Sequence, residues 1–289
     1  MSSSVSVSIV TNTAIAASKG FGWFVTGSPT LFAETIHSLA DVANQVLLKI
    51  GEVRGRSGPD AAHPFGRGQE KFFWALVSAV SVFFVGCGLN LYHGLHALTQ
   101  NVVVEPFTPL VIGLLLFAMA LESFTLMIAV REIGGWKGLI ANRHRTSVLA
   151  VVLEDAVALL GILLTLLVAG VSFVRGPQPE FDAVVAIAVG AMLGAMALFL
   201  AALNRRLLID TADPGIDRAA AQFLAKAGIP ADVTSIVIDD DRGIVFVRTQ
   251  SPVDSHVLGE ALKAHVRVHA GKTVDQVYWQ FPPHLRANA

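Results

Sequence analysis

Long apolar stretches recur along the first two thirds of the sequence, and they limit the possible folds more than any other feature. A helix needs about 20 mostly apolar residues to cross a bilayer. Only 15% of the residues are charged, compared with about 25% in an ordinary soluble domain. Each stretch is expected to be helical, because a lone strand cannot satisfy its backbone in lipid. The sequence therefore predicts an all-α bundle of six transmembrane helices, at residues 5–27, 29–53, 70–97, 107–130, 147–174 and 182–204.

Basic residues are concentrated in alternate loops of this bundle. They lie after the second, fourth and sixth stretches, whereas the opposite set of loops contains only Arg175. The positive-inside rule places the basic loops in the cytoplasm, and with them both termini. The N-terminal segment lacks the basic start and the clear cleavage site of a signal peptide, so we interpret it as a retained first span.

The last part of the chain has a different character, because charged residues and short alternating segments return. We predict a transmembrane domain at residues 1–206 and a cytoplasmic α+β domain at residues 207–289. The α+β domain is expected to have the order αββαβ, with both helices on one face of a small sheet. A domain of this size gains stability by docking or dimerisation. Its elements are predicted at residues 214–227, 233–238, 244–249, 255–269 and 273–281.

The net charge argues against a general nucleic-acid binder, and the cysteine count excludes disulfides and thiolate metal clusters within one chain. The formal net charge is −1, whereas a general nucleic-acid binder would carry a basic excess. The only cysteine is Cys87, so one chain can form neither an internal disulfide nor a thiolate metal cluster.

The second stretch contains the densest set of polar residues expected inside the membrane. Ionisable groups in hydrocarbon are costly and are functional candidates for that reason. Residues spaced by three, four and three positions share one helix face. His37 and Asp41 can bind one ion together, and an imidazole with carboxylates suits zinc, and also manganese, iron or cobalt. The alternative is a polar helix contact or a proton relay without metal. The four residues of this face are Glu34, His37, Asp41 and Asn44.

Two adjacent acids lie in the fifth stretch, Glu154 and Asp155, with apolar residues around them. Neighbouring residues of a helix point about 100° apart, so only one of the two can point directly at the second stretch. The other is expected to contact a neighbouring helix or a basic group. The predicted metal site combines His37 and Asp41 with one or both of these acids.

Two motifs carry a family resemblance: His37-Ser38-Leu39-Ala40-Asp41, and the loop run His63-Pro64-Phe65-Gly66-Arg67-Gly68-Gln69-Glu70-Lys71. Together with the acid pair and the αββαβ tail, they make nearly the whole chain resemble the cation diffusion facilitator family. The resemblance implies homodimers of six-helix subunits with a cytoplasmic metallochaperone-like domain. It also implies export of divalent metal from the cytoplasm in exchange for protons, by alternating access.

The resemblance implies a transport site made of His37, Asp41 and Asp155. The family's usual fourth ligand would lie four residues before Asp155, where this chain has Val151, which cannot bind metal. Additional oxygen ligands would favour manganese or iron over zinc. Three residues are candidates to complete the shell: Glu154, Asn44 and Glu122.

The family's two other metal sites are altered in this chain. The loop site matches Asp60 and His63, but the later histidine of the motif is Arg67, which weakens this site. In the tail only His284 is a plausible donor, so we expect the cytoplasmic binuclear site to be absent. The acidic turn at residues 239–241 is expected to be a solvated hairpin tip, with weak cation binding as the alternative.

The resulting functional prediction is a metal efflux transporter rather than an enzyme. Metal would enter near Asp60 and His63 and bind at His37, displacing protons. Protonation of His37 from the far side would then expel it, since imidazole titrates near pH 6.5. The cargo is expected to be Zn²⁺, or alternatively Mn²⁺, Fe²⁺ or Co²⁺.

Other classes stay open, namely a passive cation channel, a metal sensor or scaffold, and a membrane-embedded metal enzyme with Glu154 as general base. The enzyme is disfavoured because no second histidine lies at helical spacing from Glu154. The compact loops and the missing targeting peptide suggest a bacterial inner membrane.

Overall fold

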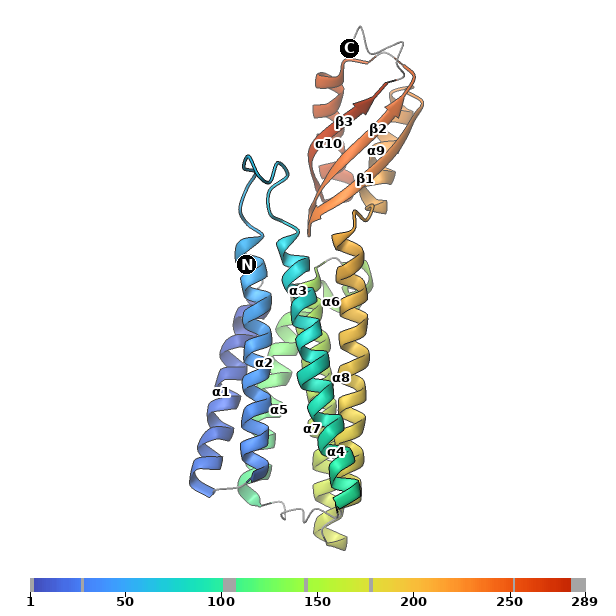
Figure 1. Ribbon diagram of the computed structural model, residues 1–289. Coiled ribbons are helices and arrows are strands. Elements are labelled where there is room, and N and C mark those ends of the chain that lie inside the picture. The colour runs from blue at the N-terminus through green and yellow to red at the C-terminus, as the bar shows by residue number, and fades with distance from the viewer. Residues whose placement is uncertain are drawn as a thin grey trace. The chain divides into compact units, whose positions relative to one another are not determined.

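The computed structural model describes residues 3–26, 29–100, 108–142, 145–176, 179–251 and 253–281 (Figure 1). The chain divides into two compact units. The first contains residues 1–53 and 71–204, and the second contains residues 54–70 and 205–289. The segment that joins the second and third long helices therefore belongs to the same unit as the C-terminal region.

Long helices make up the first unit. Their bounds are α1 (Ser3–Thr26), α2 (Pro29–Arg54), α3 (Glu70–Ser81), α4 (Gly88–Gln100), α5 (Pro109–Glu132), α6 (Gly135–Ala141), α7 (Thr146–Arg175) and α8 (Pro179–Leu208). A π-helical segment, η1 (Val82–Cys87), joins α3 to α4 without a break. The short helix α6 was not expected from the sequence, which places only a basic loop there.

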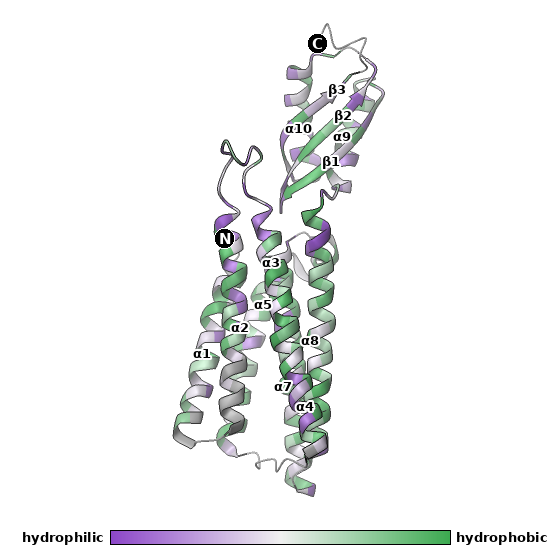
Figure 2. Cartoon of the chain, in the orientation of Figure 1, coloured by the Kyte–Doolittle hydropathy of each residue, from purple (hydrophilic) through white to green (hydrophobic). Residues whose placement is uncertain are grey.

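Four stretches of the described residues are long and apolar enough to cross a membrane: Glu70–Thr99, Pro109–Glu132, Thr146–Arg175 and Ala183–Leu208. Figure 2 shows apolar residues over most of the length of these helices. The chain is thus a multi-pass membrane protein. The first two predicted spans are helical as α1 and α2 but are not among the four, so a count of six spans stays a prediction. Polar residues along α2 lower its hydropathy.

Close helix packing in the first unit depends on glycine. A Cβ atom added at Gly94 of α4 would lie 2.8 Å from the backbone oxygen of Ala183 in α8. One added at Gly194 of α8 would lie 2.8 Å from the Cys87 sulfur, and one at Gly190 would lie 3.1 Å from the Leu91 nitrogen. We call Gly94, Gly190 and Gly194 the glycine seam. Small residues of this kind let helix backbones approach each other in membranes.

The C-terminal part of the second unit contains the predicted three-stranded sheet and the predicted order of elements. The strands are arranged β1-β2-β3, with β1 and β2 antiparallel and β2 and β3 parallel. The two helices pack against each other and on the same core, which includes Leu224, Val245 and Leu262. The bounds are α9 (Pro214–Lys226), β1 (Ala231–Asp239), β2 (Arg242–Thr249), α10 (Ser255–Ala270) and β3 (Thr273–Gln280).

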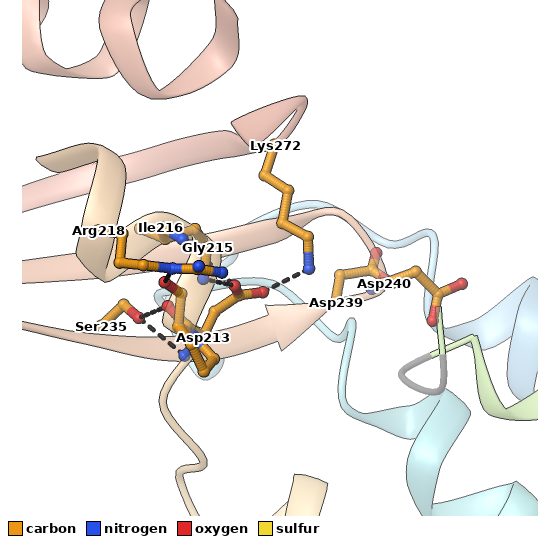
Figure 3. Close-up of polar contacts among 9 residues, drawn as sticks. Asp213, Gly215, Ile216, Arg218, Ser235, Asp239, Asp240 and Lys272 are labelled. Carbon is orange, nitrogen blue, oxygen red and sulfur yellow. Dashed lines mark hydrogen bonds and ion pairs between the residues drawn. The ribbon is translucent and has the colours of Figure 1, made fainter. Parts of the chain in front are cut away.

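Asp213 anchors the start of this C-terminal part (Figure 3). Its carboxylate accepts hydrogen bonds from the backbone nitrogens of Gly215 at 2.8 Å and Ile216 at 3.2 Å, which caps α9. It also pairs with the ammonium group of Lys272, between α10 and β3. Burial alone would raise the pKa of Asp213, but Lys272 and the two amides outweigh it and the pKa is lowered.

The segment of residues 54–70 packs on the sheet within the second unit. The ring of Phe65 meets Tyr278 of β3 edge-on with centroids 6.3 Å apart, and Tyr278 stacks on Phe246 of β2 at 5.3 Å. A Cβ atom added at Gly68 would lie 2.5 Å from the backbone oxygen of Ile238. Side chains alternate between the two faces of a sheet, so Phe246 lies on the face opposite its core neighbours Val245 and Val247.

Candidate metal site

A buried polar network connects α2, α3 and α7. The side-chain nitrogen of Asn44 donates to both carboxylate oxygens of Glu154, at 3.0 and 3.1 Å. Gln45 donates to the same carboxylate through its own amide nitrogen. Ser78 of α3 donates to the amide oxygen of Asn44 at 2.5 Å. We call Asn44, Gln45, Ser78 and Glu154 the amide bracket, and all four side chains are buried.

Asp155 is buried beside the amide bracket, with only 1% of its surface exposed. Its hydrogen-bond partner is Glu122 of α5, and it also interacts electrostatically with Asp41 of α2. Its second carboxylate oxygen, Oδ2, has no hydrogen-bond partner among the residues that the structure describes. The two adjacent acids of α7 thus face different neighbours: Glu154 bonds to α2, while Asp155 bonds to α5.

The residues predicted to bind metal are only partly brought together. Asn44 and Glu154 are in direct contact, and Asp41 is close enough to interact electrostatically with both acids of α7. His37 belongs to α2, but its side chain lies outside the described residues. Among the described side chains, no group of three or more His, Cys, Asp or Glu residues is arranged to hold a metal ion. The set His37, Asp41 and Asp155 therefore stays a prediction.

The predicted loop site is a compact ion-pair cluster. His63 Nδ1 lies 3.0 Å from Asp60 Oδ1, and Arg67 donates to Asp60 Oδ2 at 3.0 Å. Hydrogen bonds from the side chain and the backbone of His63, assisted by Arg67 and the Ala62 amide, lower the pKa of Asp60 to about 2. A metal ion would have to displace the guanidinium group from this carboxylate. These contacts favour the interpretation that Arg67 weakens the loop site.

The other predicted donors of the second unit are His284 and the acidic turn at residues 239–241. His284 lies outside the described residues. At the acidic turn, Arg242 is 3.9 Å from the Asp239 carboxylate and 3.7 Å from that of Asp275, so an arginine is already the neighbouring cation.

Sequence reasoning missed two features. The rings of His265 and His269 on α10 stack with centroids 3.8 Å apart, and their spacing of four residues would have indicated a shared helix face. In the membrane part it missed Gln45 and Ser78. Gln45 follows Asn44 directly, so the rule that selects polar residues inside a span would also have selected it.

Buried carboxylates between membrane-spanning helices are typical of multi-pass membrane transport proteins. A model of the cation efflux transmembrane domain matches residues 5–209 of the chain. The chain belongs to the cation efflux family, also known as the cation diffusion facilitators, and the resemblance drawn from the two motifs is confirmed.

Named relatives extend this comparison. The chain is 34% identical over 201 residues to the proton-coupled zinc antiporter SLC30A9, mitochondrial, of Xenopus laevis, covering 66% of this chain and 35% of the relative. It is 32% identical over 204 residues to metal tolerance protein C4 of Arabidopsis thaliana, covering 66% and 43%. It is 33% identical over 96 residues to magnetosome protein MamM of Paramagnetospirillum magneticum, covering 33% and 30%. The chain thus spans less than half the length of each of these relatives.

Proposed function

We propose that the protein exports a divalent transition-metal ion from the cytoplasm in exchange for protons, with Zn²⁺ as the main cargo. Its membership of the cation efflux family supports transport of metal, and a relative named as a proton-coupled zinc antiporter supports the cargo and the exchange. The observation that carries the proposal is Oδ2 of Asp155, which is buried in a membrane-spanning helix and has no hydrogen-bond partner among the described residues. A buried polar atom without a partner is costly in hydrocarbon, and a bound cation would satisfy it.

The proposed ligands are Asp155 of α7 with Asp41 and His37 of α2. The spacing of four residues between His37 and Asp41 places them on one face of α2. An imidazole and two carboxylates leave a fourth position for water, which suits exchangeable Zn²⁺. The ligands must be deprotonated to bind metal, so binding releases protons and couples the two fluxes. His37 can also be charged near neutral pH and release the metal when protonated.

The proposal includes a topology and an assembly. Six spans would place both termini in the cytoplasm, where the basic loops are expected. The second unit would mediate a homodimer, as the family resemblance implies, and the membrane would be a bacterial inner membrane. Cysteine accessibility labelling of the loops in cells, and the mass of the protein in detergent, test these parts separately.

The central test uses proteoliposomes that contain one dye for Zn²⁺ and another for pH. The wild-type protein is expected to move Zn²⁺ inward while protons move outward. Asp155→Asn, which removes a ligand charge while nearly preserving volume, is expected to reduce Zn²⁺ flux by at least about 100-fold, at the upper end of losses known around metal sites. Asp232→Asn, at an exposed position of β1, is the matched control and should transport normally.

Each other outcome of this test has a definite meaning. Metal flux without proton movement would indicate a passive channel and not an exchanger. Absence of flux from the folded wild-type protein would leave the enzyme or the scaffold. Normal transport by Asp155→Asn would refute the proposed site.

A further inference from the structure

Glu154 lies next to the proposed ligand Asp155, yet its carboxylate is already fully engaged by α2. Oε1 accepts from Asn44, and Oε2 accepts from Asn44 and Gln45. The side-chain amide oxygen of Asn44 accepts a hydrogen bond from the hydroxyl group of Ser78. Glu154 and Asn44 are two of the three residues that sequence analysis offers as replacements for the ligand missing at Val151. In this structure the two are committed to each other.

These hydrogen bonds are not easily replaced by contacts to a metal, because they are buried in the apolar part of the bundle. Hydrogen bonds in a low-dielectric interior are electrostatically stronger than in water. If Glu154 or Asn44 turned toward a metal, the amide nitrogen of Gln45 or the hydroxyl group of Ser78 would lose its partner. A buried donor without an acceptor is penalised, so the amide bracket favours the arrangement observed.

We propose that the amide bracket is a positioning element that keeps the oxygens of Glu154 and Asn44 away from the metal and thereby favours zinc over manganese. This inference rests on the proposed function. The proposed ligand set is then one imidazole and two carboxylates, with Glu122 as the remaining candidate for a fourth position, and this small mixed set suits four-coordinate zinc. Two further oxygen donors would make an oxygen-rich shell, which suits manganese. Gln45 and Ser78 thus act on metal choice through other residues.

The amide bracket also fixes the spacing of the ligand-bearing helices. Asn44 and Gln45 follow Asp41 by three and four positions, so they lie one turn further along α2. Glu154 immediately precedes Asp155 on α7. Hydrogen bonds between these neighbours hold α2 and α7 together beside the proposed site.

The test compares Zn²⁺ and Mn²⁺ uptake by the full-length protein in proteoliposomes, as the ratio of kcat/KM values for the two ions. Gln45→Met removes one donor to Glu154 and nearly preserves the side-chain length. Ser78→Ala releases Asn44. Each variant is expected to lower the Zn²⁺/Mn²⁺ ratio by at least about tenfold, the usual size of effect for groups that orient metal ligands. The change should appear mainly in KM for Zn²⁺.

Two control variants are matched to Ser78→Ala. Ser81 lies three residues further along α3, and its hydroxyl group donates to the backbone oxygen of Val77 in its own helix at 2.9 Å. Ser81→Ala should therefore leave the ratio unchanged. Ser78→Thr keeps a hydroxyl group at the same position and should keep the wild-type ratio.

The inference is overturned if Gln45→Met and Ser78→Ala keep the wild-type ratio, or if both metals are slowed equally. If Gln45→Met does not fold, the Zn²⁺/Mn²⁺ ratio of the less disruptive variant Ser78→Ala decides between the two outcomes. Failure of the proposed function is recognised separately, because the folded wild-type protein would then not exchange Zn²⁺ for protons.

Discussion

At the scale of single residues, Lys272 is the main counter-ion of Asp213 in the second unit. Because the pKa of Asp213 is lowered in the folded protein, the unfolded chain binds protons more readily. The resulting stabilisation is present above the unfolded pKa of about 3.9, and it is lost as the pH falls through the folded pKa.

Replacing Lys272 by methionine tests this pair. We expect Lys272→Met to lower the free energy of unfolding of the second unit by about 1–2 kcal/mol at pH 7, as for a partly buried charge-assisted hydrogen bond. The difference from wild type should begin to shrink below about pH 4, where Asp213 of the unfolded chain becomes protonated, and should be lost as the pH falls through the lowered folded pKa. Urea titration followed by pulse proteolysis of the tail measures both effects. A difference that is constant from pH 7 to pH 3 would contradict the assignment.

Arg67 occupies one carboxylate oxygen of Asp60 in the loop, where a metal ion would otherwise bind. Restoring the histidine that the family resemblance implies, by Arg67→His, would free Asp60 Oδ2 and add an imidazole beside His63. We expect a gain of about one bound Zn²⁺ per chain from the added ligand, measured by equilibrium dialysis in detergent. The matched control is Arg56→His in the same loop, which should add none. No gain in Arg67→His would mean that the loop geometry itself excludes metal.

At the scale of helices, the glycine seam allows a sharp comparison within α4. A Cβ atom at Gly94 would approach Ile187 to 2.6 Å and the Ala183 oxygen to 2.8 Å, whereas one at Gly88 would meet no atom of the described residues within 4 Å. Gly94→Ala should therefore destabilise the protein by about 1–3 kcal/mol through overpacking. Gly88→Ala should be neutral or stabilising, because alanine favours helix. Thermal unfolding in detergent measures both, and equal effects would contradict the seam.

The helices and strands are largely predictable from the sequence, because the length of apolar stretches and the alternation of apolar and polar residues indicate them. Uninterrupted apolar stretches predicted the long helices, and the αββαβ order followed from short alternating segments in the tail. The sequence does not predict α6, because Gly134 and Gly135, both at positive φ, are typical of a loop. The π-helical turn was also missed, since nothing in the apolar run around Val82 distinguishes it from an α-helix.

The partners within the candidate site were less predictable. Spacing on α2 selected Asn44, but the choice between Glu154 and Asp155 depends on the rotation of α7. That rotation is set by the packing of whole helices, which no local pattern records. The spacing of polar residues on α2 does not select Gln45, because Gln45 lies about 100° around the helix from Asn44 and so on another face. Its long side chain nevertheless reaches Glu154.

At the scale of the whole molecule, the connection between α2 and α3 is built into the second unit. Gly68 makes this possible, because a Cβ atom there would collide with the Ile238 oxygen, whereas one at Gly58 would meet nothing within 4 Å in the part of the chain that the structure describes. We expect Gly68→Ala to release the segment of residues 54–70 from the sheet. Tryptic cleavage at Arg67 should then be at least several-fold faster than in wild type, while Gly58→Ala should match wild type. Equal cleavage of all three proteins would show that Gly68 is not needed for this packing.

The π-helical turn η1 has a consequence for insertions and deletions in the third long helix. A π turn holds one residue more than an α turn, so a deletion between Val82 and Cys87 would let this turn become α-helical and keep the later side chains in place. A deletion between Gly88 and Gly94 would instead rotate everything after it by about 100°. Gly94 would then leave α8, and a bulkier side chain would face that backbone. The wide turn is therefore a place in this helix where one residue can be lost while both halves keep their packing partners.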